Sequence, residues 1–457
     1  MRLTPSTQIW ERQERMIEFV RSHPITFLNA GTGTGKTLAM LATIAFEDYQ
    51  RSIALTIKPV LRSVWARDTH KFIEGLRVIP LDKGTSKDKR KMIEATYDDP
   101  EPTIYVVNYE TARMLDLEDF EWDFAVADES HKLKSHNSSQ SIELAWSLRD
   151  VEHKVAMTGT AWEDRPTDVF GQVRFLEPGR RVRKDVLTSK RFGSWSEFFE
   201  RYVKYRTVDN IKIPVKYINQ DELAEKISDI YLHIERPQGT DVQHIIRYVD
   251  LKPSHMKEYL KFEKTSVFKS DGNRVLADNP LVLALRLHQF ACGFYKPENK
   301  DELAEVKNGD AKLEALMGIA EELGDEPFVV FTRFQEDVNR ISAALKRLGI
   351  LSLRLTGERD EHEEWQDGKA QALIANIAAG SAGVSLTRAC YGIYYSTGHS
   401  ATDFVQSLGR IDRPPQDRPV TLYHLLAFDT VDEDIHDALM GKGERAENLL
   451  NRVLERA

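Results

Sequence analysis

The sequence predicts an α/β protein built from two parallel-sheet lobes in tandem. Short apolar runs alternate with helical patterns over about the first 178 residues, and the same alternation returns from about residue 310. The stretch between these regions is more charged, and its pattern is helical with breaks at prolines. We therefore expect a first lobe over 1–178, a mostly helical insertion over 179–309 and a second lobe over 310–457.

The candidate strands of each lobe end in polar or glycine residues, which is where doubly wound sheets place their ligand sites. In the first lobe these strands are residues 25–29, 53–57, 104–107, 124–127 and 154–157. In the second lobe they are residues 328–331, 352–355, 372–375, 392–395 and 420–425. The last segment, 431–457, has the pattern of one or two charged helices.

Composition excludes several classes of protein. The 457 residues are 41% hydrophobic, carry a net charge of −9 and include only two cysteines, Cys292 and Cys390. The sequence has no apolar run of membrane-spanning length, and its first residues are too charged for a signal peptide. We expect a cytoplasmic protein with no membrane association, and the scarcity of cysteine favours a reducing compartment without structural zinc.

A glycine-rich loop, AGTGTGKT at residues 30–37, follows the first candidate strand and precedes an apolar helix. This context is typical of a P-loop, in which backbone N–H groups and the helix N-terminus surround phosphates. Lys36 is expected to reach the β- and γ-phosphates and the Thr37 hydroxyl to bind Mg²⁺. The expected nucleotide-binding residues of this loop are Gly31, Thr32, Gly33, Thr34, Gly35, Lys36 and Thr37.

An acidic pair, Asp128-Glu129, follows the strand at 124–127 and is followed by Ser130-His131. Asp128 is placed to hold Mg²⁺, and Glu129 to orient or deprotonate an attacking water. Such a pair alone would more often cap a helix. Its position 92 residues after Lys36, behind an apolar strand, favours catalysis.

Further polar segments follow later strands. Thr158-Gly159-Thr160 can sense the metal site, and 379–386 offers flexible backbone at a lobe interface. Arg410 and Arg413 have the i, i+3 spacing of one helix face, so both could face the γ-phosphate from the second lobe. They lie 374 residues or more after Lys36, so a shared nucleotide would sit in a cleft between lobes.

Residues 174–206 combine ten basic and four acidic residues, a net charge of +6, with interleaved aromatic residues. One interpretation is an amphipathic segment whose aromatic side chains enter a core, and the other is a phosphate-contacting surface. The sequence leaves both open. The candidate nucleic-acid contacts in this stretch are Arg180, Arg181, Arg183, Lys184, Lys190 and Arg191.

The order of these motifs resembles superfamily-two helicases, and among them the Swi/Snf-like translocases. The segment 59–68, with its Pro59 and Trp65, Val107-Asn-Tyr109-Glu110 and DESHKLK at 128–134 resemble family elements. So do 157–164, Phe331-Thr-Arg-Phe, 380–386, Gln406–Arg413 and 430–435. The departures are Ser130, Ser385, 399–403 and Pro414-Pro415, which leave the phosphate chemistry intact. The compact chain is similar to bacterial or phage members, so the expected location is the cytoplasm of a bacterium or an infected host.

The resemblance implies two RecA-like lobes that use ATP and Mg²⁺, with DNA across both lobes and helical protrusions from the insertion. Gln13 is expected to contact adenine, and Gly383, Arg410 and Arg413 to complete the ATP site. Trp65 and Tyr109 become further nucleic-acid candidates. The expected coupling residues are His131, Thr158, Gly159, Thr160 and Gln406.

Three functional hypotheses follow. The first is a nucleic-acid-stimulated ATPase that translocates on mostly duplex DNA. The second is a helicase that separates or anneals strands on branched DNA or RNA, since the same ATP motifs would serve it. The third, from another class, is a nucleotide-regulated DNA-binding clamp, which loss of Glu129, Arg410 or Arg413 would have favoured; all three are present. The sequence identifies neither protein partners nor pathway.

Overall fold

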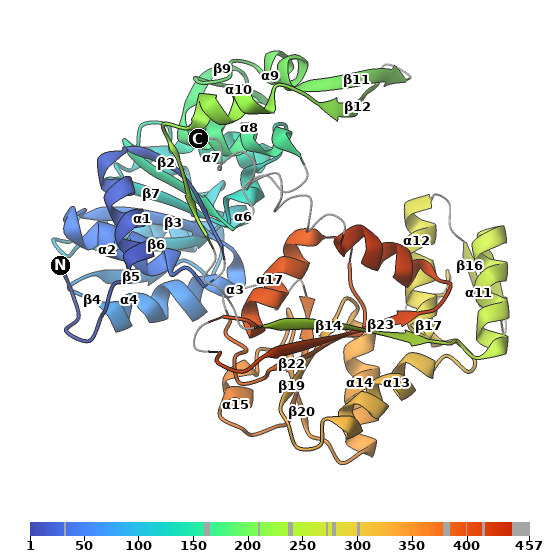
Figure 1. Cartoon of the computed structure of the whole chain (residues 1–457). Coiled ribbons are helices and arrows are strands. Elements are labelled where there is room, and N and C mark those ends of the chain that lie inside the picture. Colours follow the sequence, from blue (N-terminus) through green and yellow to red (C-terminus); the bar gives the residue numbers. More distant parts are fainter. Residues whose placement is uncertain are drawn as a thin grey trace. The chain divides into compact units, whose positions relative to one another are not determined.

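Two sheet-centred units make up the chain in the computed structural model (Figure 1). The structure describes residues 1–440 except 32, 160–164, 209–210, 236–240, 271–272, 277–279, 299–301, 378–383, 399 and 414–415. Among the described residues, the first unit ends before Pro237 and the second unit begins after Gln238 and continues to residue 440. Two parallel sheets with flanking helices confirm the predicted tandem α/β lobes.

The first unit contains a seven-stranded sheet among its described residues, and every neighbouring pair of strands is parallel. Apolar runs form the central strands because both sheet faces are covered by helices. In spatial order the strands are β13 (Tyr231–Ile234), β2 (Ile25–Ala30), β8 (His153–Thr158), β7 (Phe124–Asp128), β3 (Arg51–Thr56), β6 (Thr103–Asn108) and β5 (Arg77–Pro80).

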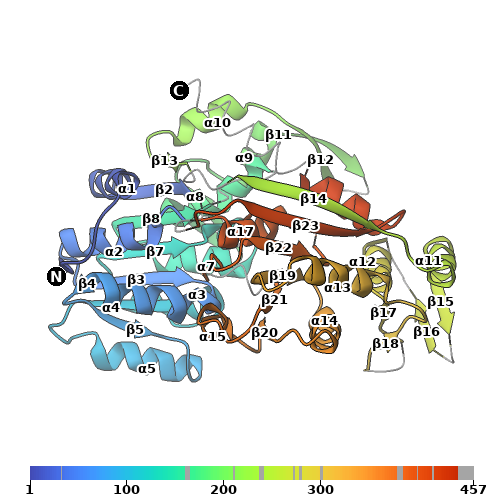
Figure 2. The ribbon, with the colours of Figure 1, turned by 60° about the horizontal axis from the view of Figure 1, so that its bottom comes forward.

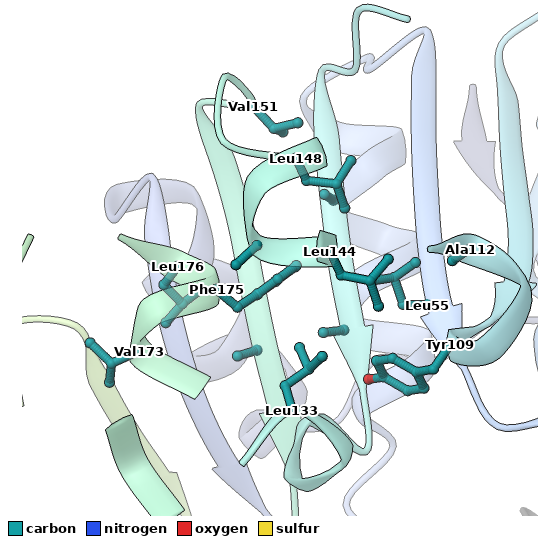
Figure 3. Close-up of a cluster of buried hydrophobic side chains, with 14 of the residues drawn as sticks. Leu55, Tyr109, Ala112, Leu133, Leu144, Leu148, Val151, Val173, Phe175 and Leu176 are labelled. Atoms are coloured by element: carbon teal, nitrogen blue, oxygen red, sulfur yellow. The ribbon is translucent and has the colours of Figure 1, made fainter. Parts of the chain in front are cut away.

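Helices connect these strands and bury apolar faces against the sheet. They are α1 (Glu11–Ser22), α2 (Lys36–Phe46), α3 (Lys58–Val60), the π-helical turn Leu61–Ala66, α4 (Arg67–Phe72), α5 (Ser86–Thr96), α6 (Tyr109–Ala112), α7 (Ser139–Ser147) and α8 (Val169–Leu176). Short 3₁₀ turns lie at Leu117–Asp119, Ser130–Leu133 and Pro166–Asp168, and β1 (Arg2–Leu3) pairs with β4 (Ile73–Glu74). Figure 3 shows part of the resulting core, in which Leu144 of α7, Leu148 directly after α7 and Phe175 of α8 point toward the strands.

The rest of the first unit lies after α8. It consists of β9 (Pro178–Arg183), β10 (Val186–Ser189), α9 (Trp195–Tyr202), β11 (Val203–Val208), β12 (Ile211–Tyr217) and α10 (Gln220–Ile227). The strands form two antiparallel hairpins, β9–β10 and β11–β12. In Figure 1 the β11–β12 hairpin extends away from the seven-stranded sheet.

The second unit has a six-stranded sheet among its described residues, again with parallel neighbours throughout. In spatial order the strands are β14 (Val242–Val249), β23 (Val420–Ala427), β22 (Tyr391–Tyr394), β19 (Phe328–Thr332), β21 (Ala372–Asn376) and β20 (Ser352–Leu355) (Figure 2). The helices are α11 (Pro253–Thr265), α12 (Pro280–Ala291), α13 (Ala311–Glu322), α14 (Gln335–Arg347), α15 (His362–Gln366), α17 (Ala401–Ile411) and the helical residues 431–440. Two small hairpins, β15 (Val267–Ser270) with β16 (Asn273–Leu276) and β17 (Phe294–Tyr295) with β18 (Ala304–Glu305), complete it.

The segment 179–309 differs from the expected mostly helical insertion. Its described residues contain the strands β9–β18 as well as four helices. The division between units falls after Pro237, because β13 pairs with β2 of the first sheet while β14 pairs with β23 of the second. The boundaries expected at 178 and 309 therefore do not coincide with the division between units.

Candidate nucleotide site in the first unit

A tight loop joins β2 to α2 at the carboxyl edge of the first sheet. Gly33 and Gly35 have φ values of 80° and 77°, a left-handed conformation that glycine adopts without steric cost. The Thr34 hydroxyl donates a hydrogen bond of 2.8 Å to the Gly31 carbonyl and so closes the loop on itself. The turn leads directly into the N-terminus of α2, where backbone N–H groups and the helix dipole favour an anion.

Gln13 of α1 contacts this loop through its side-chain amide. Its Nε2 donates to the Gly35 carbonyl over 3.3 Å, and its Oε1 accepts from the Trp10 N–H over 2.9 Å. A Cβ atom on Gly35 would lie only 2.0 Å from this Nε2, so a larger residue would displace the Gln13 amide in addition to straining φ. The side chain expected at adenine is thus 2% exposed and bonded within the chain through both amide atoms.

Two ionisable groups converge beside the loop. Lys36 begins α2, and its Nζ lies 3.9 Å from Glu129 Oε1, with both side chains largely buried. Glu129 follows β7 with a φ of 57°, an uncommon conformation for a residue with a side chain. Thr37 is half-buried in the first turn of α2. The structure thus brings the predicted lysine and catalytic glutamate together at one sheet edge.

The Asp128 carboxylate lies at the end of β7 and is 3% exposed. Its Oδ2 accepts hydrogen bonds from the Trp65 indole N–H over 3.0 Å and from the Thr56 hydroxyl over 3.2 Å. Burial, and secondly the charge of Glu129, raises the pKa of Asp128, while Lys36 and the two hydrogen bonds oppose that rise. Trp65 and Thr56 therefore fix the orientation of this carboxylate and favour its charged form.

Two expected nucleic-acid contacts are buried instead. Trp65 has no exposed surface and Tyr109 is 1% exposed. The Tyr109 hydroxyl donates to the Asp128 backbone carbonyl over 2.7 Å, and burial raises the pKa of this phenol well above its usual range. In this structure both aromatic residues position Asp128, and neither presents a surface to a nucleic acid.

The segment after Glu129 connects the acidic pair to β8. His131 Nδ1 lies 3.3 Å from both Glu129 Oε2 and Thr158 Oγ1, so two expected coupling residues are in contact. Gly159 packs against the start of the glycine-rich loop, where an added Cβ would lie 3.4 Å from Gly31 Cα. Thr160, like Thr32 and Gly383, lies outside the described residues.

In the second unit, Gln406 and Arg410 lie on α17 and are each 5% exposed. The α-helix ends at Ile411, so Arg413 lies two residues beyond it and does not continue the helix face on which Arg410 lies. The expectation that Arg410 and Arg413 share one helix face is therefore wrong. The Pro414-Pro415 sequence explains why the helix does not continue through Arg413, because a residue before proline is disfavoured in the helical conformation.

The basic and aromatic stretch is divided between structural and exposed roles. Phe192, Phe198 and Tyr202 are buried in the core of the first unit, as the amphipathic interpretation predicted. Arg191 pairs with Glu177 and Asp229.

Among the predicted cations, Arg181 donates to Glu143 over 2.8 Å and to the Lys184 carbonyl over 2.9 Å. Arg181 and Arg191, two of the predicted nucleic-acid contacts, are therefore bonded to other residues of the first unit. The cations that remain exposed are Arg180, Arg183, Lys184 and Lys190.

Sequence reasoning missed Thr56 and Gln172. Thr56 ends β3 beside β7, so its position at the end of a neighbouring strand was the available signal. Gln172 of α8 accepts a hydrogen bond of 2.7 Å from Ser130, which the sequence does not reveal. Within the described part of the chain, no cluster of three or more His, Cys, Asp or Glu side chains forms a metal site, and no helix combines the length and apolarity needed to span a membrane.

A parallel sheet with this loop, Lys36 at the following helix and an acidic pair on a nearby strand defines a P-loop nucleotide-binding unit. The chain belongs to the family of the SNF2-related domain, whose model matches residues 16–296.

Proteins similar to the chain include p41 of Acyrthosiphon pisum secondary endosymbiont phage 1, which is 24% identical over 93% of this chain and 94% of its own. A Bacillus subtilis protein described as an ATP-dependent helicase/translocase, YwqA, is 24% identical over 90% of this chain and 45% of its own. The DNA excision repair protein ERCC-6-like of Bos taurus is 23% identical over 94% and 40%. The chain thus spans nearly all of p41 but less than half of the other two.

A solved structure, the Sulfolobus solfataricus SWI2/SNF2 ATPase core in complex with dsDNA, is similar over 97% of this chain and 93% of its own, with 19% identity and a TM-score of 0.44.

Proposed function

We propose that this protein is an ATP-driven motor that translocates on DNA, mainly duplex DNA, in a bacterial or phage-infected cytoplasm. The observation that carries the proposal is the convergence of Lys36, Asp128 and Glu129 beside a loop that exposes a helix N-terminus. The names of relatives, a helicase/translocase and a DNA repair protein, support a nucleic-acid motor.

The residues present fit a magnesium nucleotide. Two neighbouring carboxylates, Asp128 and Glu129, face one lysine, and burial raises the pKa of Asp128. A divalent cation would compensate this excess of negative charge, and Asp128 with the Thr37 hydroxyl would hold it. Mg²⁺, when bound, supplies neutralisation of phosphate charge.

The chain's own groups have distinct tasks in the proposed hydrolysis. Lys36 binds terminal phosphate oxygens from the start of α2, where helix N–H groups add to its charge. Glu129 orients a water molecule and accepts its proton as the water attacks the γ-phosphorus; the bond from that phosphorus to the bridging oxygen breaks, and ADP leaves. His131, in contact with both Glu129 and Thr158, transmits the state of this carboxylate toward β8.

Arg410 and Arg413 act from the second unit in this proposal. Their guanidinium groups stabilise negative charge that develops on the phosphate, as arginine side chains do in related phosphoryl transfers. In this proposal Arg410 and Arg413 act only when the two units close on ATP. Hydrolysis would then be coupled to movement, because the closed and open states bind the nucleic acid differently. Contacts mainly to sugar and phosphate would give little sequence preference.

The test is the ATPase rate with no nucleic acid, single-stranded DNA, duplex DNA, forked DNA or RNA. We expect stimulation by closed circular duplex DNA, without a requirement for ends, and at least a hundredfold lower activity for Lys36→Ala, which loses a charge that stabilises the transition state (roughly 3 kcal/mol or more). No hydrolysis with any nucleic acid, or an unaffected Lys36→Ala variant, would refute the motor and favour the clamp. Stimulation by RNA alone would overturn the DNA assignment, and unwinding of a forked duplex would favour the strand-separating helicase.

A further inference from the structure

The β11–β12 hairpin has one face attached to the first unit. Val203 is buried, and Tyr205 packs against Phe199 of α9 with ring centroids 5.6 Å apart. On the same side, Lys212 lies 4.4 Å from the centre of the Tyr205 ring and donates a hydrogen bond of 3.0 Å to Glu200. The charge on this attached face is therefore compensated within the protein.

The opposite face carries three cations. The register shifts between Lys204 and Tyr205, and the extra residue, Val215, lies on β12. Side chains therefore still alternate along β11, and Lys204 and Arg206 point away from the side of Val203 and Tyr205. Lys216 lies directly across from Lys204 in the register of the hairpin, and all three cations are exposed. Within the described part of the chain, none of the three forms an ion pair.

This arrangement costs folding stability. Like charges directly opposite each other in a two-stranded ribbon are destabilising, by a few tenths to about 1 kcal/mol, and an isolated hairpin is marginally stable on its own. The neighbouring Lys212–Glu200 pair shows that the same hairpin can pair its cations. A face of opposed lysines is explained if its counter-charge is supplied by another molecule.

We propose that the face formed by Lys204, Arg206 and Lys216, here termed the cationic hairpin face, binds phosphates along a groove of duplex DNA. A two-stranded ribbon fits the major groove, which is about 12 Å wide, and cations on one face can then reach the flanking phosphates. Lys204, Arg206 and Lys216 are exposed, and Figure 1 shows the hairpin extending from the rest of the first unit. The inference rests on the proposed function, because it assumes that duplex DNA is the partner.

The test compares two triple variants with the same loss of charge. The first is Lys204→Ser with Arg206→Ser and Lys216→Ser. The control is Lys83→Ser with Lys87→Ser and Lys91→Ser, three exposed cations in or just before α5, which follows β5 at the far edge of the sheet.

Binding to a fluorescent 30-base-pair duplex is measured by anisotropy between about 50 and 200 mM KCl, a range in which phosphate contacts are strongly salt-dependent. For three lost phosphate contacts we expect the slope of log K against log salt to decrease in magnitude by about 2.7. The control should retain the slope of the unmodified protein. Binding of a fluorescent ATP analogue should be unchanged in both, because the substituted residues are exposed and lie outside the P-loop. The thermal midpoint should not fall in either variant, and it should rise slightly in the hairpin variant because the opposed lysines are removed.

A second variant separates binding from folding. Lys204→Glu places an acid opposite Lys216, which should raise the thermal midpoint slightly while weakening duplex binding. If the unmodified protein binds duplex with a steep salt dependence but both the hairpin triple variant and Lys204→Glu bind like the α5 control, the hairpin proposal is overturned and the motor stands. If the unmodified protein neither binds duplex nor is stimulated by it, the proposed function itself fails.

Discussion

Replacement of Trp65 by phenylalanine removes one hydrogen bond from the carboxylate at the centre of the proposed site. The indole N–H donates to Asp128 Oδ2 over 3.0 Å, and neither side chain is more than 3% exposed. Phenylalanine keeps an aromatic ring in the core but has no donor. The substitution therefore tests whether Trp65 positions a catalytic carboxylate or merely fills space.

A hydrogen bond to a charged group contributes roughly 1.5–3 kcal/mol. If this energy stabilises the ionised carboxylate in the reaction, its loss lowers kcat/KM for ATP by about 10- to 150-fold. The bond from Trp65 also lowers the pKa of Asp128, against the effect of burial. Its removal raises that pKa, so the acid limb of the pH profile of kcat/KM should move to higher pH.

Trp122→Phe is the matched control. Trp122 is 7% exposed in a hydrophobic cluster of the first unit, and its indole N–H donates over 3.0 Å to the Leu117 carbonyl. Both variants should lose thermal stability, since each leaves a small cavity and removes one of two hydrogen bonds to its acceptor; Thr56 still donates to Asp128 and the Phe120 N–H to Leu117. Only Trp65→Phe should move the acid limb. Equal kcat/KM losses and unshifted profiles in both variants would refute a positioning role for Trp65.

Gly35→Ala should weaken nucleotide binding, because alanine is strained at a φ of 77° and its Cβ would displace the Gln13 amide from the loop, whereas Gly349→Ala, with a similar φ of 75° and open space, should lower only the thermal midpoint. Burial raises the pKa of Asp337 to about 7, so the folded state holds this proton more tightly than the unfolded state does. The free energy of unfolding should therefore decrease as the pH rises from about 4 to 7, by up to about 1.4 kcal/mol per pH unit. Asp337→Asn should remove that decline in denaturation midpoints against pH. Burial lowers the pKa of Lys154 to about 7, so the unfolded state holds the proton more tightly and stability should rise from about pH 7 to 10, a rise that Lys154→Met should abolish.

Different results would contradict each of these three expectations. Retained nucleotide affinity in Gly35→Ala would show that the loop does not need the conformation observed here. An Asp337→Asn variant with an unchanged pH dependence would show that other groups cause the loss of stability as the pH rises from about 4 to 7. A Lys154→Met variant whose stability still rises from pH 7 to 10 would show that Lys154 keeps its charge in the folded state.

The strands and the phosphate loop could be predicted because their signals are local. Apolar runs such as 124–127 end in polar residues, and a glycine-rich turn before a helix has few alternative structures. The ten expected strands are all present. By contrast, β13 and β14 were missed, since both are edge strands with exposed or mixed positions and no apolar run. Missing them led to the expectation of a single insertion at 179–309.

The site was predictable in its charged residues but not in their supports. Lys36 begins the helix after β2, and Asp128-Glu129 lies at the end of β7, so their positions follow from where predictable strands end. Whether an aromatic residue lies inside or outside depends on long-range packing, so Trp65 beside arginines in sequence gave no sign that its indole reaches Asp128. The end of α17 was signalled by Pro414, which the i, i+3 spacing of the arginines obscured.

The most direct test of the central claim is displacement of a fluorescent triplex-forming strand from duplex DNA during ATP hydrolysis. The account predicts displacement that requires ATP and is lost in Glu129→Gln, which keeps the size of the side chain but cannot accept the proton of the attacking water. Binding of the ATP analogue should persist in that variant. Displacement that continues without hydrolysis, or duplex-stimulated hydrolysis by the unmodified protein without any displacement, would contradict the claim that the site built on Lys36, Asp128 and Glu129 drives movement along DNA.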